Sequence, residues 1–175
     1  MLTHLKEKQV PAQKGAGEAT LALFTSYLET QGRESVGQIR QEMREVMTHK
    51  VGVFRIEEGM QEAIASLISF KRRASKVAIS TKDMRMNQEL LERWELDNLL
   101  DNAMTIAQGA LMRKESRGAH FREDYPERSD EFQFHTLVSM TEFGKVSFGK
   151  RPIDMSIYES KDEHYEQFRI MPRKY

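Results

Sequence analysis

The chain has 175 residues, and its 27 basic and 27 acidic side chains balance to a net charge of zero. This length suits one domain, or one domain with an appendage, and it can hold a core without disulfides. Cysteine is absent, which excludes disulfides, thiolate metal sites and cysteine nucleophiles. The neutral balance argues against nucleic-acid binding, and no apolar run is long enough to span a membrane, so we expect a cytoplasmic protein without membrane insertion.

The predicted elements begin with a polar linker or lead-in over residues 1–17 and a short helix over 18–29, which stops at Gly32. A second helix opens at Glu34 or Ser35. Its apolar residues recur at the spacing of one helix face, namely Val36, Ile39, Met43, Val46 and Met47. Amphipathic helices of this kind need a neighbour to cover their apolar face.

The segment 51–54 is apolar at every position, which leaves a helix continuation and a buried connection open. A third helix follows and ends in the basic run 71–73, where cations complement the exposed carbonyls of a helix end. The apolar stripe of this helix is Met60, Ile64, Leu67 and Ile68. Its spacing again predicts one buried face.

The longest predicted helix starts at Asn87, a residue that can cap it, and runs to about Arg113. Its expected inner face comprises Trp94, Leu96, Leu99, Leu100, Ala103, Ala107, Ala110 and Leu111. The small residues on that face permit close approach of a neighbouring helix. Three long amphipathic helices in series predict a mainly α fold with an antiparallel bundle, and we place the helical region at 18–115.

The remaining region, 116–175, has a different character. The stretch 113–131 holds five basic and six acidic residues without periodicity, so we expect an irregular loop. Two runs rich in aromatic and β-branched residues, 132–143 and 145–153, flank Gly144 and predict a β-hairpin. A polar tail completes the chain.

Glycine-rich nucleotide cradles are not found, because Gly15-Ala16-Gly17 lacks the third glycine and a preceding strand. A metal site built from His120, Asp124 and His135 can be imagined, although nothing in their spacing requires one. The competing interpretation is a histidine that is hydrogen-bonded within a polar loop.

The charged loop itself has two interpretations. Arg117, Arg122 and Arg128 carry fork-shaped donors that match carboxylates, and Glu123 and Asp124 can serve as their internal partners. Such a network would fix the loop against a neighbour. Alternatively, some of the arginines face an anionic substrate. Composition favours the structural network.

This loop also resembles a known family. Residues 113–128 are similar to the R-x-E-S-R-G-A-H-x-R-x-D-[FY]-P-x-R block of succinate dehydrogenase and fumarate reductase flavoprotein subunits. Four further segments resemble motifs of that family in the same order: Val51-Gly52-Val53-Phe54-Arg55, residues 95–100, His135 to Pro152, and the final 172–175. The resemblance covers the chain from about Gly15 onward.

The resemblance implies a C-terminal domain with a three-helix, spectrin-repeat-like bundle and a small β-hairpin tail. It implies FAD in the full-length subunit, and as partners the flavin-binding domain of that subunit and an iron–sulfur subunit, with peripheral attachment to a membrane through partner subunits. In the family the catalytic and flavin-linking residues lie upstream of this domain. The resemblance therefore assigns no catalytic, cofactor-binding or metal residue to this chain.

Two functions stay open. The first is a non-catalytic domain that braces the flavin domain of an enzyme, and the second is a stand-alone helical interaction module. For the first, we expect a structural charge network at an interdomain or subunit contact, formed by Arg113, Glu115, Arg117, His120, Arg122, Asp124 and Arg128.

Overall fold

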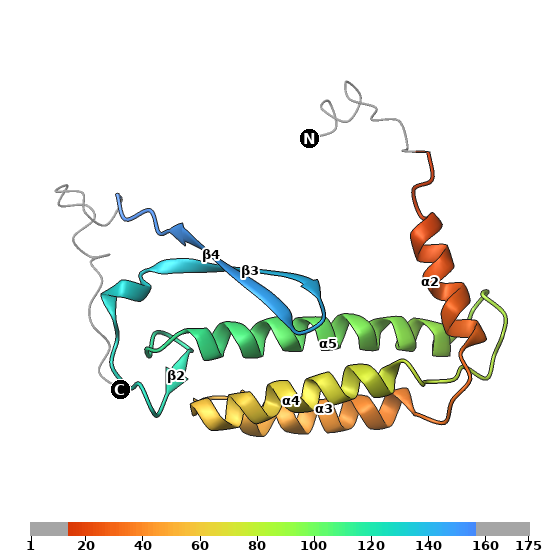
Figure 1. The fold of residues 1–175 in the computed structure, drawn as a ribbon, viewed down its shortest axis with the longest axis horizontal. Helices are drawn as coiled ribbons and strands as arrows, with labels where there is room; N and C mark the ends of the chain where they lie inside the picture. Colours follow the sequence, from red (N-terminus) through yellow and green to blue (C-terminus); the bar gives the residue numbers. More distant parts are fainter. Residues whose placement is uncertain (1–13, 157–175) are drawn as a thin grey trace. The chain divides into compact units, whose positions relative to one another are not determined.

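The computed structural model describes residues 14–156, and Figure 1 draws their helices and strands. Within that range the chain is mainly helical, with four α-helices and one antiparallel strand pair. The helices are α2 Glu18–Glu29, α3 Val36–Lys50, α4 Glu57–Ala74 and α5 Gln88–Met112. None of these helices is long and apolar enough to cross a membrane. Most of the predicted lead-in and the end of the tail, residues 1–13 and 157–175, lie outside the described range.

The helix boundaries follow local capping chemistry. The side-chain oxygen of Asn87 accepts a hydrogen bond of 3.0 Å from the Leu90 amide, which satisfies one of the free donors at the start of α5. The α2 helix has the predicted bounds 18–29 and begins after Gly17, whose φ of 93° suits glycine. The predicted start of the longest helix at Asn87 is therefore confirmed.

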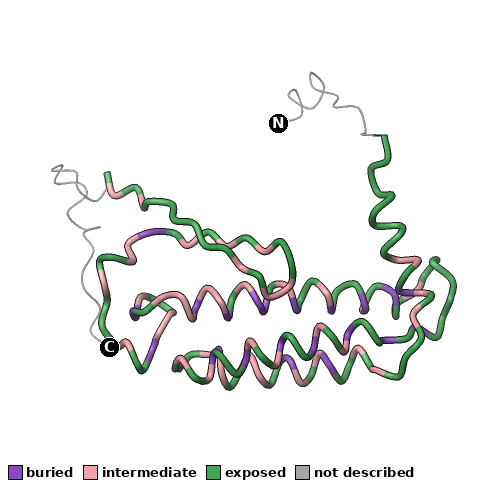
Figure 2. The backbone as a smooth tube through the Cα atoms, viewed as in Figure 1, coloured by how far each residue is buried: buried purple, intermediate pink, exposed green. Residues whose placement is uncertain are grey.

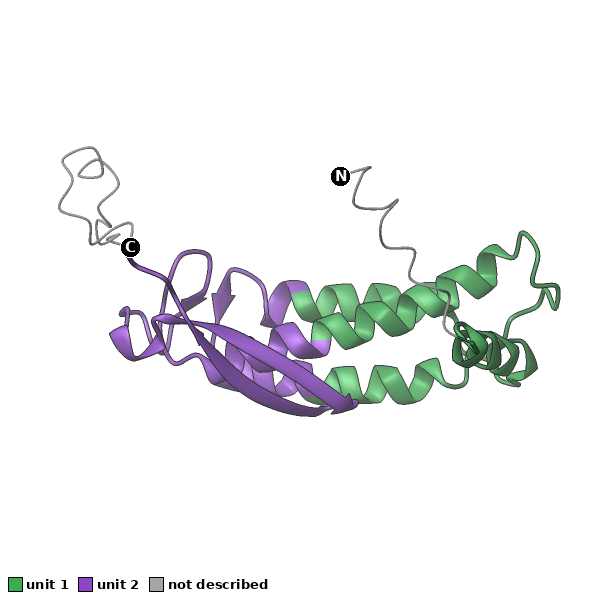
Figure 3. Cartoon of the chain, turned by 90° about the horizontal axis from the view of Figure 1, so that it is seen from above, with its two compact units in different colours: residues 1–47, 65–103 green, residues 48–64, 104–175 purple. Residues whose placement is uncertain are grey.

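The chain divides into two compact units, which Figure 3 colours separately. Among the described residues, the first comprises 14–47 and 65–103, and the second comprises 48–64 and 104–156. Helices α3, α4 and α5 each contribute residues to both units. The division therefore cuts across the helical region 18–115 that the sequence predicts.

The core of the first unit contains the apolar faces of its helices, with the buried segments marked in Figure 2. Its buried side chains include Tyr27, Ile39, Met43, Leu67, Phe70, Val77, Ile79, Leu90, Leu96 and Leu100. Three residues of the expected inner face of α5 are not buried: Trp94 is 38% exposed, Leu99 is 39% exposed and Leu111 is half-buried. Trp94 lies next to buried Arg93, and Leu99 lies between the buried residues Leu96 and Leu100. Both side chains are on the exposed face of the helix, so the prediction was wrong for Trp94 and Leu99. Ala103 is buried, as its small size predicts.

A polar network joins α2 to α4 and α5 in the first unit. The Tyr27 hydroxyl donates to Asp97 over 2.5 Å, and Arg93 lies over the Tyr27 ring at 4.4 Å while pairing with Asp97 at 2.7 Å. Lys71 Nζ lies 3.0 Å from Asp97, and Arg73 pairs with Glu34 and Glu42. The basic run 71–73 occupies the last turn of α4, as the sequence predicts, and two of its cations also bind carboxylates of other segments.

One close approach in this unit admits only glycine. A Cβ added at Gly32 would stand 1.9 Å from the Lys76 carbonyl oxygen. We expect Gly32→Ala to lower the free energy of unfolding by about 1–3 kcal/mol, because backbone must shift to admit the methyl group. Gly37 in α3 is the matched control, since its nearest neighbour would lie at 3.8 Å. Gly37→Ala should stabilise the helix by about 0.5–1 kcal/mol in the same urea titration.

The second unit contains the predicted hairpin and a two-residue parallel ladder. Its strands are β1 Phe54–Arg55, β2 Phe121–Arg122, β3 Phe134–Glu142 and β4 Lys145–Pro152, with a 3₁₀ turn at Asp130–Phe132. Strand β3 pairs antiparallel with β4 across Gly144, whose φ is 83°, and this confirms the hairpin. Strand β1 pairs parallel with β2. Val51 is buried, but Val53 and Phe54 are 68% and 66% exposed, so a buried connection is wrong for that part of the segment.

Candidate functional site

Glu115 is the centre of a buried arginine–carboxylate network in the second unit. Its side chain is fully buried and accepts hydrogen bonds from Arg113 at 2.7 Å and from Arg117 at 3.0 and 3.1 Å. The Ser129 amide donates to the same carboxylate at 3.0 Å. Burial acts to raise the pKa of Glu115, but these donors hold it below its ordinary value of 4.5. The carboxylate is therefore ionised and satisfied at neutral pH.

Arg113 connects this carboxylate to the start of the hairpin. Its guanidinium donates to the Thr136 hydroxyl at 2.9 Å and to the Phe134 carbonyl at 3.2 Å, and it also contacts the Phe132 carbonyl. It lies 5.2 Å from the centre of the Phe134 ring, a cation–π contact. The fork of one arginine thus holds the end of the 3₁₀ turn and the start of β3.

Arg122 and Asp124 form a second pair that caps two helices at once. Arg122 is fully buried and binds Asp124 with both arms of its fork, at 2.7 and 2.5 Å. Its remaining arm donates to the Leu111 carbonyl at the end of α5, at 3.0 Å. The Asp124 carboxylate accepts from the Glu57 amide, at 2.9 Å, at the start of α4. A cation at a helix C-terminus and an anion at an N-terminus are each stabilising, so the pair joins two helix ends.

The pKa of Asp124 reflects this arrangement. The hydrogen bonds that Asp124 accepts from Arg122 and from the Glu57 amide keep the pKa of its carboxyl below the ordinary value of 3.8. Ser116 supports the turn between the two clusters, because its buried hydroxyl accepts from the Arg122 amide at 2.9 Å and donates to the Tyr125 carbonyl at 2.8 Å. No sequence pattern predicted this role of Ser116.

His120 is held in its neutral form. Its Nδ1 lies 2.8 Å from Arg55 Nη1, and because a guanidinium can only donate, Nδ1 must accept. The proton therefore lies on Nε2, which donates to the Arg113 carbonyl at 3.3 Å. Burial lowers the pKa of His120 below its ordinary 6.5, and the charges of Arg55, Arg113 and Arg122 lower it further. Protonation would place a fourth cation in the cluster and break the bond to Arg55.

This histidine makes stability depend on pH. Because the pKa of His120 is lower in the folded chain than its unfolded value near 6.5, the unfolded chain binds more protons as the solution is acidified. We expect the free energy of unfolding to fall as pH decreases below 6.5 toward the lowered pKa, and to be retained above it. Urea titrations between about pH 7.5 and pH 5 measure this slope. The fall in the free energy of unfolding should begin near the ordinary histidine pKa of about 6.5. His120→Asn should flatten it.

The structure brings together six of the seven predicted network residues, in two linked clusters around Glu115 and around Arg122. Arg128 is the exception, since among residues 14–156 it pairs with exposed Asp130, at 3.3 Å, and with no member of the two clusters. Of the two predicted internal partners, Asp124 fills that role, whereas Glu123 is exposed and contributes its backbone amide to the Arg55 carbonyl. Sequence reasoning missed Arg55 as a member of the network. Its signal was the segment 51–55 that resembles the family motif.

The imagined metal site is not formed by these residues. Across residues 14–156, no three histidine, aspartate or glutamate side chains are placed to hold a metal ion together. His120 and Asp124 instead bind Arg55 and Arg122. Within the second unit, the arrangement thus consists of arginines whose carboxylate and carbonyl partners belong to the chain itself.

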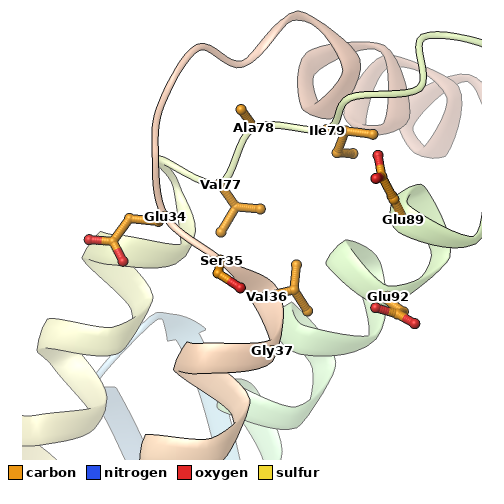
Figure 4. A pocket seen from close by; sticks show the side chains of 9 residues that line it. All are labelled: Glu34, Ser35, Val36, Gly37, Val77, Ala78, Ile79, Glu89 and Glu92. Carbon is orange, nitrogen blue, oxygen red and sulfur yellow. The ribbon is translucent and has the colours of Figure 1, made fainter.

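The first unit has a cavity of about 310 Å³ near the start of α3. Figure 4 shows Val36, Val77 and Ile79 at its centre, with Glu89 at one side, on α5, and Glu34 at the opposite side. Glu34 pairs with Arg73 at 3.0 Å, and Glu89 accepts from the Ser80 and Thr81 amides. These two carboxylates therefore have structural partners.

Comparison with known proteins gives the same family from sequence and from fold. The family described as fumarate reductase flavoprotein C-term matches residues 40–175. The mitochondrial succinate dehydrogenase [ubiquinone] flavoprotein subunit of Oryza sativa subsp. japonica is 36% identical over 91% of this chain and 25% of its own length. The fumarate reductase flavoprotein subunit of Helicobacter pylori is 38% identical over 74% of this chain and 19% of its own.

A solved structure of E. coli quinol fumarate reductase has the same fold, with a TM-score of 0.75 and 31% identity over 84% of this chain and 26% of that chain. The chain thus spans about a quarter of the length of the rice subunit and of the E. coli chain. The chain belongs to the family of succinate dehydrogenase and fumarate reductase flavoprotein subunits and matches their C-terminal domain.

Proposed function

We propose that this chain acts as the non-catalytic C-terminal helical domain of an FAD-dependent flavoprotein that interconverts succinate and fumarate. The observation that carries this proposal is the match of residues 40–175 to the C-terminal part of that family. The charge network agrees with a bracing role, because Glu115 and Arg122 are fully buried and partnered within the chain. Groups so engaged fix a structure and are not available to a substrate.

Within this role we propose a spectrin-repeat-like antiparallel bundle formed by α3, α4 and α5. The helical region would comprise 18–115, and 116–175 would pack on it as a charged loop, hairpin and tail, after a linker at 1–17. Support comes from the apolar spacing of the three helices and from the buried small residues Ala103, Ala107 and Ala110 on α5.

The proposed partners are the flavin-binding domain of the same flavoprotein and an iron–sulfur subunit. FAD would be bound by the flavin-binding domain, and attachment to a membrane would be peripheral and mediated by other subunits. The seven residues of the predicted network, Arg128 included, would keep the loop in the shape that those contacts require. Charges arranged in this way determine how two domains align more than they strengthen the contact between them.

A chimera tests this proposal. Residues 15–175 of this chain would replace the matching C-terminal segment in a full-length flavoprotein of the family, for which the E. coli quinol fumarate reductase chain is one choice. We expect the chimera to retain FAD and succinate–fumarate turnover, and the 175-residue chain alone to show neither. A flavin spectrum that copurifies with the isolated chain would overturn the proposal, as would a chimera that does not bind FAD while its parent does.

A further inference from the structure

The connection between α3 and α4 presents three exposed apolar side chains within four residues. Val53 is 68% exposed, Phe54 66% and Ile56 42%. We call these three residues the apolar tip. Phe54 packs edge-on against Phe121, with 5.9 Å between ring centres, but the contact leaves most of the Phe54 surface open. Covering exposed apolar side chains of this kind with another surface is energetically favourable.

The backbone beneath the apolar tip is held by the charge network. Arg55 donates from Nε to the Gly52 carbonyl at 2.7 Å and from Nη1 to His120 at 2.8 Å. The Glu123 amide donates to the Arg55 carbonyl at 2.9 Å, and Phe54 pairs in register with Phe121. A Cβ at Gly52 would stand 2.3 Å from the Thr48 carbonyl oxygen, so the turn before the tip accepts only glycine.

This rigidity has an energetic consequence for association. Covering an exposed valine or phenylalanine recovers about 1.5–3 kcal/mol for each side chain. A loop that is already ordered loses little conformational entropy when it docks, so more of that free energy remains for binding. Aromatic anchors held on a fixed backbone have the properties of interface hot spots. The apolar tip therefore has the properties of a surface that binds a partner.

We infer that the apolar tip is the contact through which this chain packs against the flavin-binding part of its flavoprotein, an inference that rests on the proposed function. About three quarters of the rice subunit and of the E. coli chain lies outside the segment that this chain matches, and supplies the neighbour. The main charges of the network are already paired within the chain, so in this part of the second unit the apolar tip, and not the network, offers an open contact surface.

The chemistry of the opposing surface follows from the border of the apolar tip. Glu57 and Glu58 form the first turn of α4 directly after Ile56, and Glu58 is exposed. The flavin-binding part should therefore offer an apolar depression bordered by lysine or arginine. Opposite charge at such a border orients the encounter, while the apolar contact holds the complex.

Single cysteines provide the test, because the chain has none of its own. Phe54→Cys and, as a second probe, Val53→Cys would be labelled with a maleimide in the isolated chain and in the FAD-loaded chimera, and each labelled peptide would be quantified by mass spectrometry. We expect labelling at both positions to be at least about tenfold slower in the chimera, which corresponds to about 1.4 kcal/mol of protection. Leu137→Cys, 46% exposed on the hairpin, is the control and should react at similar rates in both proteins.

Three outcomes would overturn the inference. Equal labelling of Phe54→Cys in the isolated chain and in an FAD-loaded chimera means that the flavin-binding part does not cover the tip. Slow labelling already in the isolated chain means that another part of this chain covers it, or a second copy if dilution restores the rate. Equal protection of Leu137→Cys means that the contact is not centred on the tip. A chimera without FAD counts against the proposed function instead.

Discussion

Glu115→Gln is expected to lower the free energy of unfolding by about 3–5 kcal/mol, because it leaves arginines without their buried counter-charge. The glutamine amide can accept with only one oxygen, whereas the carboxylate accepts from Arg113, from Arg117 twice and from the Ser129 amide. The amide nitrogen of the glutamine would also face the N–H donors of the arginines, with which it cannot form a hydrogen bond. Urea denaturation at pH 7, followed by circular dichroism, measures the loss.

Glu123→Gln is the matched control for this prediction. It makes the same chemical change in the same loop, at an exposed side chain. Exposed positions of this kind change the free energy of unfolding by no more than about 0.5 kcal/mol. If Glu115→Gln cost no more than its control, Glu115 would not be the centre of the network.

Arg122→Met should have a loss of similar size, about 3–5 kcal/mol, because it removes the buried partner of Asp124 while keeping most of the side-chain volume. The change also deletes the bond to the Leu111 carbonyl at the end of α5. Asp124 would lose the arginine that orients it toward the Glu57 amide. We therefore expect faster hydrogen exchange in the first turn of α4, measured together with urea denaturation.

Arg122→Lys separates charge from geometry. Lysine keeps the positive charge but lacks the planar fork that binds both oxygens of Asp124 and still reaches a helix carbonyl. An intermediate loss is expected. Full stability of Arg122→Lys would show that charge alone suffices, and unchanged exchange in Arg122→Met would contradict the role of the pair in capping α4.

The sequence predicted the helices well because their signals are local. The cap at Asn87, the apolar spacing of α3 and the glycine of the hairpin each act within a few residues. It also predicted that Asp124 would serve as an internal partner of the arginines. Composition shows which charges are available in a short loop, and two of them lie two residues apart along the chain.

Other features depend on contacts between distant segments, which periodicity does not reveal. Arg55 lies 65 residues before His120, and the two meet only because β1 pairs with β2. The run 51–54 is apolar, so its composition suggested burial, yet Val53 and Phe54 point outward because the Arg55 contacts fix the turn. Trp94 has an apolar ring that the pattern placed inside, and it is partly exposed. Neighbouring exposed apolar side chains, as at Val53 and Phe54, are typical of an interaction site, whereas a single one such as Trp94 is common on protein surfaces.

The most direct test of a purely structural charge network is Arg117→Ala in the chimeric flavoprotein. Arg117 binds Glu115 with two nitrogens and the Ser129 carbonyl at 2.8 Å. If the network braces the domain, the melting temperature of the chimera falls, while succinate turnover per bound flavin stays at the value of the unsubstituted chimera. An unchanged melting temperature with loss of turnover per flavin would contradict the account and give Arg117 a part in the chemistry.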